Sequence, residues 1–242
     1  EHIKAADKVS LTILAGETCG VVGESGSGKT SLALALLRLI SSRGEIELHG
    51  HPIQAVRQRR LKPLRGKMQV VFQDPYGSLS PRLTVSQIVA EGLVAHRIGT
   101  QTEREAQVIE ALEGVGLDPA ARHRYPHEFS GGQRQRLCVA RALAVEPEFI
   151  VCDECVSAMD VSVQAQVLNL LRELQEKRGL TYLFISHDLS VVKFMSDEVA
   201  VMQAGKIVET GGAEELYRNP KETYTQELLE AVPRGDIETL QS

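Results

Sequence analysis

The clearest chemical pattern in the sequence is a glycine-rich loop that could hold a chain of phosphates. It reads GESGSGKT at 23–30 and satisfies G-x-x-x-x-G-K-[ST], with a strand-like run before it and a helix-like run after it. The glycines let backbone N–H groups turn inward around phosphates, and the start of a helix adds partial positive charge. We expect Lys29 to reach the β and γ phosphates and the Thr30 hydroxyl to bind Mg²⁺. The predicted nucleotide-binding residues of this loop are Gly23, Glu24, Ser25, Gly26, Ser27, Gly28, Lys29, Thr30 and Ser31.

Two acidic residues directly follow an apolar run and offer the carboxylates that a phosphate enzyme needs. The run from Phe149 to Cys152 is typical of a buried strand, and Asp153 and Glu154 come next. We expect Asp153 to hold Mg²⁺ through water and Glu154 to orient and polarise an attacking water. An acidic strand end on the surface is the alternative, but it would have to coincide with the glycine-rich loop independently.

A second pair of glycines stands at the start of another predicted helix. In the pentapeptide FSGGQ at 129–133, Ser130 lies 100 residues after Thr30, and the helical run QRQRLCVARALA follows the glycines. A serine and two glycines at a helix N-terminus offer a second phosphate-sized patch of backbone donors. One nucleotide does not need two such cradles in one chain.

Two of the four cysteines have the C-x-x-C spacing of redox and metal sites. Cys152, however, is the last apolar position of the predicted buried strand, and the residues between Cys152 and Cys155 are the two acids. A zinc site needs about four ligands, and Cys19 and Cys138 belong to other predicted elements. We therefore expect the cysteines to pack in the fold of a protein from a reducing compartment, without thiol chemistry.

The elements that position these motifs alternate between strand and helix. The alternation predicts a largely parallel sheet covered by helices. Between about residues 74 and 148 the strand signal almost vanishes, and the runs at 85–98, 102–116 and 131–144 predict an inserted, mostly helical subdomain. Further helices are expected at 31–40, 164–177 and 225–232. The predicted strands are 8–13, 17–22, 44–50, 68–72, 148–153, 181–186, 198–202 and 206–210.

Length and composition set outer limits on the function. With 242 residues, 43% of them hydrophobic, the chain fits one large domain or two small lobes. The formal net charge of -5, with both signs mixed, argues against a dedicated binder of nucleic acid or anionic membranes, and the basic run at 57–67 is interpreted as a solvated face. No uncharged apolar run reaches the roughly 18 residues that span a bilayer, so any membrane role would be peripheral. Because the chain begins inside a strand-like run without methionine, we expect it to be a piece of a longer protein.

Taken together, the motifs resemble those of the nucleotide-binding domains of ABC transporters, and the resemblance covers essentially the whole chain. The loop at 23–30 resembles Walker A, the pentapeptide at 129–133 the signature, and 149–154 Walker B. Three further motifs follow in the family's order. Gln73 resembles the Q-loop glutamine, the run SAMD at 157–160 the D-loop, and His187 the switch histidine.

The fold implied by this resemblance is an α/β P-loop NTPase of ABC type. It has a RecA-like parallel sheet core, an N-terminal antiparallel β subdomain and an inserted α-helical subdomain. The whole chain would be a single ABC ATPase domain with three parts. These are the catalytic core with the β subdomain at 1–73 and 149–215, the helical subdomain with the signature at 74–148, and a C-terminal helical extension at 216–242.

In this family two domains pair head to tail, so that each ATP lies between Walker A of one domain and the signature of the other. The resemblance implies that Glu154 is the catalytic base, that His187 contacts the γ-phosphate, and that Gln73 links Mg²⁺ to the membrane subunits. The implied metal residues are Thr30, Gln73 and Asp153. The further nucleotide-binding residues that it implies are Ser130, Gly131, Gly132, Gln133 and Asp160.

Finer features are similar to the ATPases of oligopeptide, dipeptide and nickel importers, above all to the C-terminal half of the fused two-ATPase subunit of peptide and microcin C importers. Such an ATPase powers import from the cytoplasmic face of the inner membrane. Its partners would be a second nucleotide-binding domain, either a sister domain or an identical chain, then permease subunits and indirectly a solute-binding protein, with no nucleic acid. The cargo stays open between peptides, peptide-like compounds and nickel or another small solute.

Two departures from the family pattern bear on the site. No aromatic residue between Glu1 and Val9 offers a platform for adenine, so we expect that contact to lie before the sequence begins. The family's D-E-P-[TV]-S-A-L-D reads DECVSAMD here, with Cys155 in the proline position beside Glu154. A non-transport ABC ATPase acting on ribosomes or chromosomes is the less favoured alternative, because no long coiled-coil insertion or charged linker is present. Intact Glu154 and His187 argue against a regulatory module without catalysis.

Overall fold

Three parallel strands form the centre of the sheet on which the site is built. In the computed structural model, which describes residues 4–231, β1 (Thr18–Val22) pairs in parallel with β6 (Thr181–Ile185) on one side and with β7 (Glu198–Gln203) on the other. β1 is buried along its whole length, as expected for a strand covered on both faces. Beyond β7, the strand β8 (Lys206–Gly212) pairs antiparallel, and β5 (Phe149–Asp153) lies on the other side of β6.

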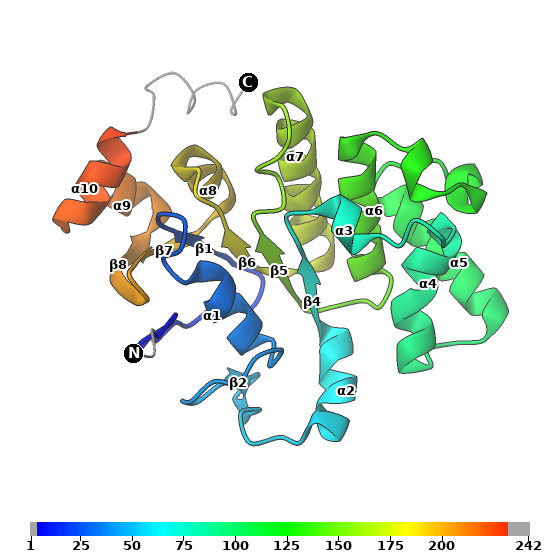
Figure 1. The fold of residues 1–242 in the computed structure, drawn as a ribbon, viewed down its shortest axis with the longest axis horizontal. Coiled ribbons are helices and arrows are strands. Elements are labelled where there is room, and N and C mark those ends of the chain that lie inside the picture. Colours follow the sequence, from blue (N-terminus) through cyan, green and yellow to red (C-terminus); the bar gives the residue numbers. More distant parts are fainter. Residues whose placement is uncertain (1–3, 232–242) are drawn as a thin grey trace. The chain divides into compact units, whose positions relative to one another are not determined.

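The chain divides into two compact units, which are described here one by one. The first comprises Glu1–Ser42, Val151–Glu154 and Thr181–Ser242. Besides the strands it contains α1 (Lys29–Leu36), α8 (Leu189–Met195), α9 (Ala213–Arg218) and α10 (Thr223–Glu230). Figure 1 shows α9, in orange, beside β7 and β8, and α10, in red, follows it. Because α8 packs closely on β1, a Cβ on Gly20 would lie 2.5 Å from Val192 Cγ1.

The second unit, Arg43–Ile150 and Cys155–Leu180, is mostly helical. Its three central helices, α4 (Val85–His96), α5 (Gln101–Gly114) and α6 (Gly131–Leu143), pack on one another and lie side by side in Figure 1. Its other elements are β2 (Glu47–Leu48), β3 (His51–Pro52), α2 (Gln58–Lys67), β4 (Met68–Val71), α3 (Pro75–Ser78), α7 (Val161–Arg178) and two 3-10 turns at Pro119–His123 and Pro126–Glu128. Its fully buried side chains include Ile88, Leu93, Leu112, Leu137, Leu143, Leu168 and Leu171.

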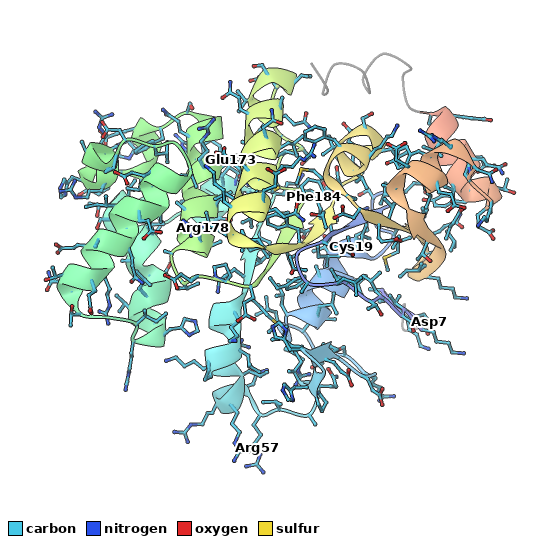
Figure 2. All side chains as sticks on the ribbon, turned by 180° about the vertical axis from the view of Figure 1, so that it is seen from behind. Asp7, Cys19, Arg57, Glu173, Arg178 and Phe184 are labelled. Atoms are coloured by element: carbon cyan, nitrogen blue, oxygen red, sulfur yellow. The ribbon has the colours of Figure 1, made fainter. Side chains whose placement is uncertain are left out.

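Capping residues fix where the helices of the second unit begin. Thr84, Thr100 and Ser130 each accept a hydrogen bond from the backbone N–H three residues later, and the side chain at that later position returns a bond to the cap's own N–H. These capping boxes satisfy N–H groups that have no partner within the helix. The basic helix α2 is exposed along most of its length, and Figure 2 shows Arg57 directed into solvent at its start, as a solvated face requires.

Most predicted elements are confirmed. The strands predicted at 17–22, 68–72, 148–153, 181–186, 198–202 and 206–210 correspond to β1, β4, β5, β6, β7 and β8, and the helices at 85–98, 102–116, 131–144 and 164–177 fall on α4 to α7. The helix predicted at 31–40 is α1, which ends at Leu36, shortly before Arg38 takes a φ of +57°.

One predicted strand is wrong. Residues 8–13 alternate between exposed and half-buried positions, as an edge strand would, but they pair with no strand among the described residues. A strand requires a hydrogen-bonding neighbour as well as the right alternation. The strand predicted at 44–50 is reduced to the two residues of β2, paired antiparallel with β3.

The division into catalytic core, helical subdomain and C-terminal extension stays a prediction. Part of the extension, together with the end of the helix predicted at 225–232, falls on residues 232–242, which lie outside the described residues. Between residues 4 and 231, none of the helices combines the length and the apolarity needed to cross a membrane.

Candidate functional site

The glycine-rich loop joins the end of β1 to the start of α1, and its path requires glycine at two positions. Gly23 has a φ of +154°, and a Cβ there would lie 2.0 Å from the Met202 carbonyl oxygen. Gly28 has a φ of +105°, and its Cβ would lie 1.9 Å from the Ala5 carbonyl oxygen. The loop is therefore held against backbone on two sides, and the free N–H groups at the start of α1 follow it directly.

Lys29 is buried at the centre of this loop. Its Nζ donates hydrogen bonds to the carbonyl oxygens of Gly23, at 2.7 Å, and Glu24, at 2.8 Å. Burial lowers the pKa of Lys29, although Glu154 and Asp153 oppose the shift. The ammonium group thus lies beside the inward-turning amides, which is where an anion would be bound.

Ser27 supplies a further polar group to the loop. Its side chain is 5% exposed, and its Oγ has no hydrogen-bond partner among residues 4–231. A buried hydroxyl without a partner costs free energy unless a ligand or water satisfies it. The donors of the loop therefore fit a chain of phosphates.

Thr30 and Asp153 come together although 123 positions separate them in the sequence. The Thr30 hydroxyl donates to Asp153 Oδ1 at 3.1 Å, and Asp153 is only 6% exposed. Burial raises the pKa of Asp153, and Glu154 adds to the rise, while the Thr30 hydrogen bond and Lys29 lower it. Hydroxyl and carboxylate oxygens are ligands that Mg²⁺ accepts, so this pair fits the metal that the sequence predicts.

Glu154 and His187 form the second pair at the same edge of the sheet. His187 Nδ1 lies 3.3 Å from Glu154 Oε2, with the histidine side chain 55% exposed and the glutamate 20%. Glu154 has a φ of +50°, and its N–H donates to the Ile185 carbonyl at 2.9 Å. In the parallel register Val21 pairs with Ile185, so the loop after β1 and the segment after β6 leave the sheet at one edge. A carboxylate and an imidazole at this edge can accept and orient the protons of a water.

In the second unit, the glycine pair lies at the exposed start of α6, as predicted. The Ser130 hydroxyl accepts from the Gln133 N–H at 3.3 Å, and Gln133 Oε1 accepts from the Ser130 N–H at 3.0 Å. Within residues 4–231 the Ser130 hydroxyl donates to no acceptor, so its proton is available to a ligand. A Cβ on Gly131 would meet nothing within 4 Å, whereas a Cβ on Gly132 would lie 2.4 Å from Val163 Cγ1. The helix start therefore faces open space at Gly131.

The other two predicted residues of the second unit have partners in the D-loop segment or in α7. Gln73 is exposed, and its Nε2 donates to Ser157 Oγ at 3.1 Å. Asp160 caps α7, because its Oδ1 accepts from the Val163 N–H at 3.0 Å and from the Ser162 hydroxyl at 2.8 Å. These bonds, the Val163 one above all, lower the pKa of Asp160.

The structure thus brings the glycine-rich loop, Asp153, Glu154 and His187 together within the first unit. Gln73, the residues from Ser130 to Gln133, and Asp160 belong to the second unit. Their roles toward a nucleotide stay predictions.

The cysteines are packing residues. All four are free and buried, and the prediction that Cys152 packs inside the sheet is confirmed. Burial raises the pKa of Cys19 to about 12 and of Cys138 to about 11, so these thiols stay protonated at neutral pH. Within residues 4–231, no three or more His, Cys, Asp and Glu side chains gather as metal ligands would.

Two tyrosines of the C-terminal helices contact the site and were missed from the sequence. The Tyr224 hydroxyl accepts a hydrogen bond from the Glu24 N–H at 3.2 Å. The Tyr217 hydroxyl donates to the carbonyl oxygen of Leu189, two positions after His187. For this region the sequence predicts only a C-terminal helical extension at 216–242. A local sequence pattern cannot predict contacts between residues that are so far apart in the chain.

Known proteins share both the sequence and the fold. Residues 6–157 match the family described as ABC transporter. The peptidoglycan transport ATP-binding protein YejF of Agrobacterium fabrum is 57% identical over 96% of this chain and 42% of its own length. The oligopeptide transport ATP-binding protein OppF of Bacillus subtilis is 53% identical over 97% of this chain and 78% of its own length. The chain therefore spans less than half of the first relative and about three quarters of the second.

Among solved structures, the dimeric, post-hydrolysis structure of the ATP-binding cassette MJ0796, bound to ADP and Pi, is 29% identical. It matches with a TM-score of 0.77 over 86% of this chain and 90% of its own. The ABC ATPase fold predicted from the motifs is confirmed by this similarity. The chain belongs to the ABC transporter family, as one of its ATP-binding cassettes.

Proposed function

We propose that this chain is the ATPase of an importer for peptides or peptide-like compounds. The observation that carries the proposal is the pair of Glu154 and His187, whose Oε2 and Nδ1 lie 3.3 Å apart in the unit that also contains the phosphate loop. The residues needed to bind ATP and those needed to activate water are thus present in one chain.

Each residue of the loop has a distinct task in this proposal. The loop amides that have no partner of their own surround the phosphates, and Lys29 places its ammonium beside them because two backbone carbonyls hold it in the loop. Thr30, Asp153 and Gln73 would hold Mg²⁺, which when bound neutralises charge on the phosphate oxygens. Asp153 suits this task because burial makes its uncompensated negative charge costly.

Glu154 takes a proton from the attacking water, and His187 aligns that water with the γ-phosphate. The imidazole is within reach of the carboxylate and is more than half exposed, so it can face a bound substrate while it orients the base. Loss of Glu154 would remove the base and leave the loop's donors untouched. ATP binding and hydrolysis should therefore be separable by mutation.

The signature residues serve a partner domain. Ser130, Gly131, Gly132 and Gln133 lie at an exposed helix start with a free hydroxyl proton, and the MJ0796 cassette, which is 29% identical, is dimeric in its solved structure. We infer that these residues, together with Asp160, bind the nucleotide held by a second nucleotide-binding domain, either a sister domain or an identical chain. The permease subunits would hold the pair at the cytoplasmic face of the inner membrane, with a solute-binding protein acting indirectly.

The cargo is inferred from the relatives. Proteins with 52–57% identity are named for peptidoglycan transport, oligopeptide transport and peptide import. The ATPase itself does not hold the cargo, so the inference to peptides rests on these names.

The test uses the full-length protein assembled with its permeases in proteoliposomes. We expect the wild type to hydrolyse ATP and to import short peptides, and Glu154→Gln to lose at least about 100-fold in turnover while it still binds ATP. Glu148→Gln is the matched control, since Glu148 is an exposed carboxylate near the start of β5 that pairs with Lys67 and His49. Turnover at the wild-type rate by Glu154→Gln would overturn the catalytic assignment. ATP-driven uptake of nickel but not of peptides would overturn the cargo alone.

A further inference from the structure

The C-terminal helices of the first unit contact both loops that carry its predicted site residues. Tyr224, on α10, accepts the Glu24 N–H at 3.2 Å, although 200 positions separate the two residues. Tyr217, on α9, donates to the carbonyl oxygen of Leu189 at the start of α8. One hydroxyl therefore bonds the backbone of the glycine-rich loop, and the other bonds the first residue of the helix that follows His187.

Tyr224 lies on α10, and hydrogen bonds to β8 fix the start of this helix. Glu209 on β8 accepts from the N–H groups of Lys221, at 2.8 Å, and Glu222, at 3.1 Å, directly before α10 begins. Burial would raise the pKa of Glu209, but the pKa is lowered on balance, and the hydrogen bonds from these two N–H groups and the Lys221 charge contribute to that. The carboxylate thus stays ionised at neutral pH and fixes the start of α10 to the sheet.

At the loop, Glu24 is held from both ends of its backbone. Its N–H donates to Tyr224, and its carbonyl oxygen accepts from Lys29 Nζ at 2.8 Å. The same carbonyl oxygen also accepts from the Ser27 N–H at 3.2 Å, so among the described residues the tyrosine hydroxyl is the partner of the Glu24 N–H, and without it Glu24 would be held through its carbonyl alone. The position of Lys29 relative to the loop amides depends on that restraint, so Tyr224 should affect how tightly the loop binds phosphates.

Tyr217 restrains the segment that follows His187. Leu189 lies two residues after the histidine, and Asp188 caps the same helix by accepting from the Ser190 N–H at 2.8 Å. Burial raises the pKa of Tyr217, so its hydroxyl remains a neutral donor at every pH of interest. The Lys193 ammonium lies 5.7 Å from the ring centroid and adds a cation–π contact. Tyr217 should therefore affect the placement of His187, and through it the hydrolysis step.

We propose that α9 and α10 form a clasp in which Tyr224 positions the phosphate loop and Tyr217 positions the His187 segment. Both are positioning residues, because each acts on the backbone of another residue. Tyr224 acts on ATP affinity and Tyr217 on turnover. The proposal rests on the ATPase function proposed above, and it gives the C-terminal helices a positioning role in the site.

The test compares Tyr224→Phe and Tyr217→Phe in the full-length protein assembled with its permeases. Each change removes one hydroxyl and keeps the ring. Tyr76→Phe is the matched control, since Tyr76 is 66% exposed and its hydroxyl has no hydrogen-bond partner in the described part of the chain. We expect Tyr224→Phe to raise the KM and the Kd for ATP roughly three- to tenfold at an unchanged kcat, which is the effect of one net hydrogen bond. We expect Tyr217→Phe to lower kcat by a similar factor at an unchanged Kd, and the control to change neither.

Two results would overturn the clasp. One is wild-type kinetics in both variants. The other is that KM and kcat change together in both variants in proportion to the fall in melting temperature, which is what general destabilisation would produce. A wild type without ATPase activity would instead refute the proposed function. The two failures are therefore distinguishable.

Discussion

Replacing Gly28 with alanine should distort the phosphate loop, and the structure supplies a matched control in the same loop. Gly28 has a φ of +105°, and its added Cβ would lie 1.9 Å from the Ala5 carbonyl oxygen. Gly26 has a φ of +80°, but its added Cβ would meet nothing within 4 Å. Both alanines would be destabilised by the left-handed backbone, but only the Cβ added at Gly28 would also clash with another part of the chain.

The two costs can be separated in magnitude. A left-handed backbone costs a non-glycine residue about 1–2 kcal/mol, and this term is common to both variants. At Gly28 the Ala5 carbonyl must also retreat by about 1.1 Å to reach the 3.0 Å below which real Cβ contacts essentially never occur. The segment around Ala5 is held by the hydrogen bond from the Asp7 N–H to the Gly205 carbonyl, at 2.7 Å. Its loss adds about 0.5–1.5 kcal/mol.

The assay is thermal unfolding of the purified full-length variants without added nucleotide, followed by titration with ATP. At about 2–4 °C per kcal/mol for a domain of this size, Gly28→Ala should melt about 1–6 °C below Gly26→Ala. ATP binding should be lost in Gly28→Ala, because the amides that surround the phosphates move together with Lys29. Equal melting temperatures, or a more stable Gly28→Ala, would refute the reasoning from this contact.

Three further predictions concern Asp153, Ser130 and Cys155. Burial raises the folded-state pKa of Asp153, so the free energy of unfolding falls as pH rises from the unfolded-state pKa through the folded-state pKa. Asp153→Asn should abolish that fall and raise the melting temperature at pH 7. Its ATPase activity should drop. Thermal unfolding across pH checks this, and a lower melting temperature at pH 7 would contradict it. Ser130→Ala removes a helix cap and should lower the free energy of unfolding, measured in urea, by about 1 kcal/mol. Ser130→Thr should retain most of this stability, and an equal loss in the two variants would argue against capping. Cys155→Pro should shift Glu154 from its φ of +50° toward an extended backbone. We therefore expect kcat to fall at an unchanged Kd for ATP. An unchanged kcat would show that hydrolysis does not need this conformation of Glu154.

The parallel core could be predicted because its strands are apolar along most of their length. β1, β5 and β6 are buried almost end to end, so continuous hydrophobic runs marked them without ambiguity. The strand predicted at 8–13 failed for a different reason. Its alternation is real in the structure, but no neighbouring strand supplies hydrogen bonds, and a local pattern carries no information about a distant partner.

The same distinction applies to the site. The motifs placed the phosphate loop, Asp153 and Glu154 correctly at strand ends, and parallel strands bring such ends to one edge, where the Thr30–Asp153 and Glu154–His187 pairs form. The contacts of Tyr217 and Tyr224 could not be predicted, because each depends on where a C-terminal helix lies against the sheet.

The unusual cysteine beside the predicted base is better explained by backbone geometry than by thiol chemistry. Cys155 is buried, as is Cys152, and the residues between them are the two carboxylates of the site. A proline at 155 would restrict Glu154 to extended backbone, whereas a cysteine allows the left-handed φ of +50°. That conformation is costly for a non-glycine residue, and the Glu154 N–H bond to the Ile185 carbonyl, at 2.9 Å, helps to hold it. The C-x-x-C spacing therefore arises because a cysteine stands in the proline position beside the predicted base, and we expect the backbone freedom that it gives Glu154 to affect turnover.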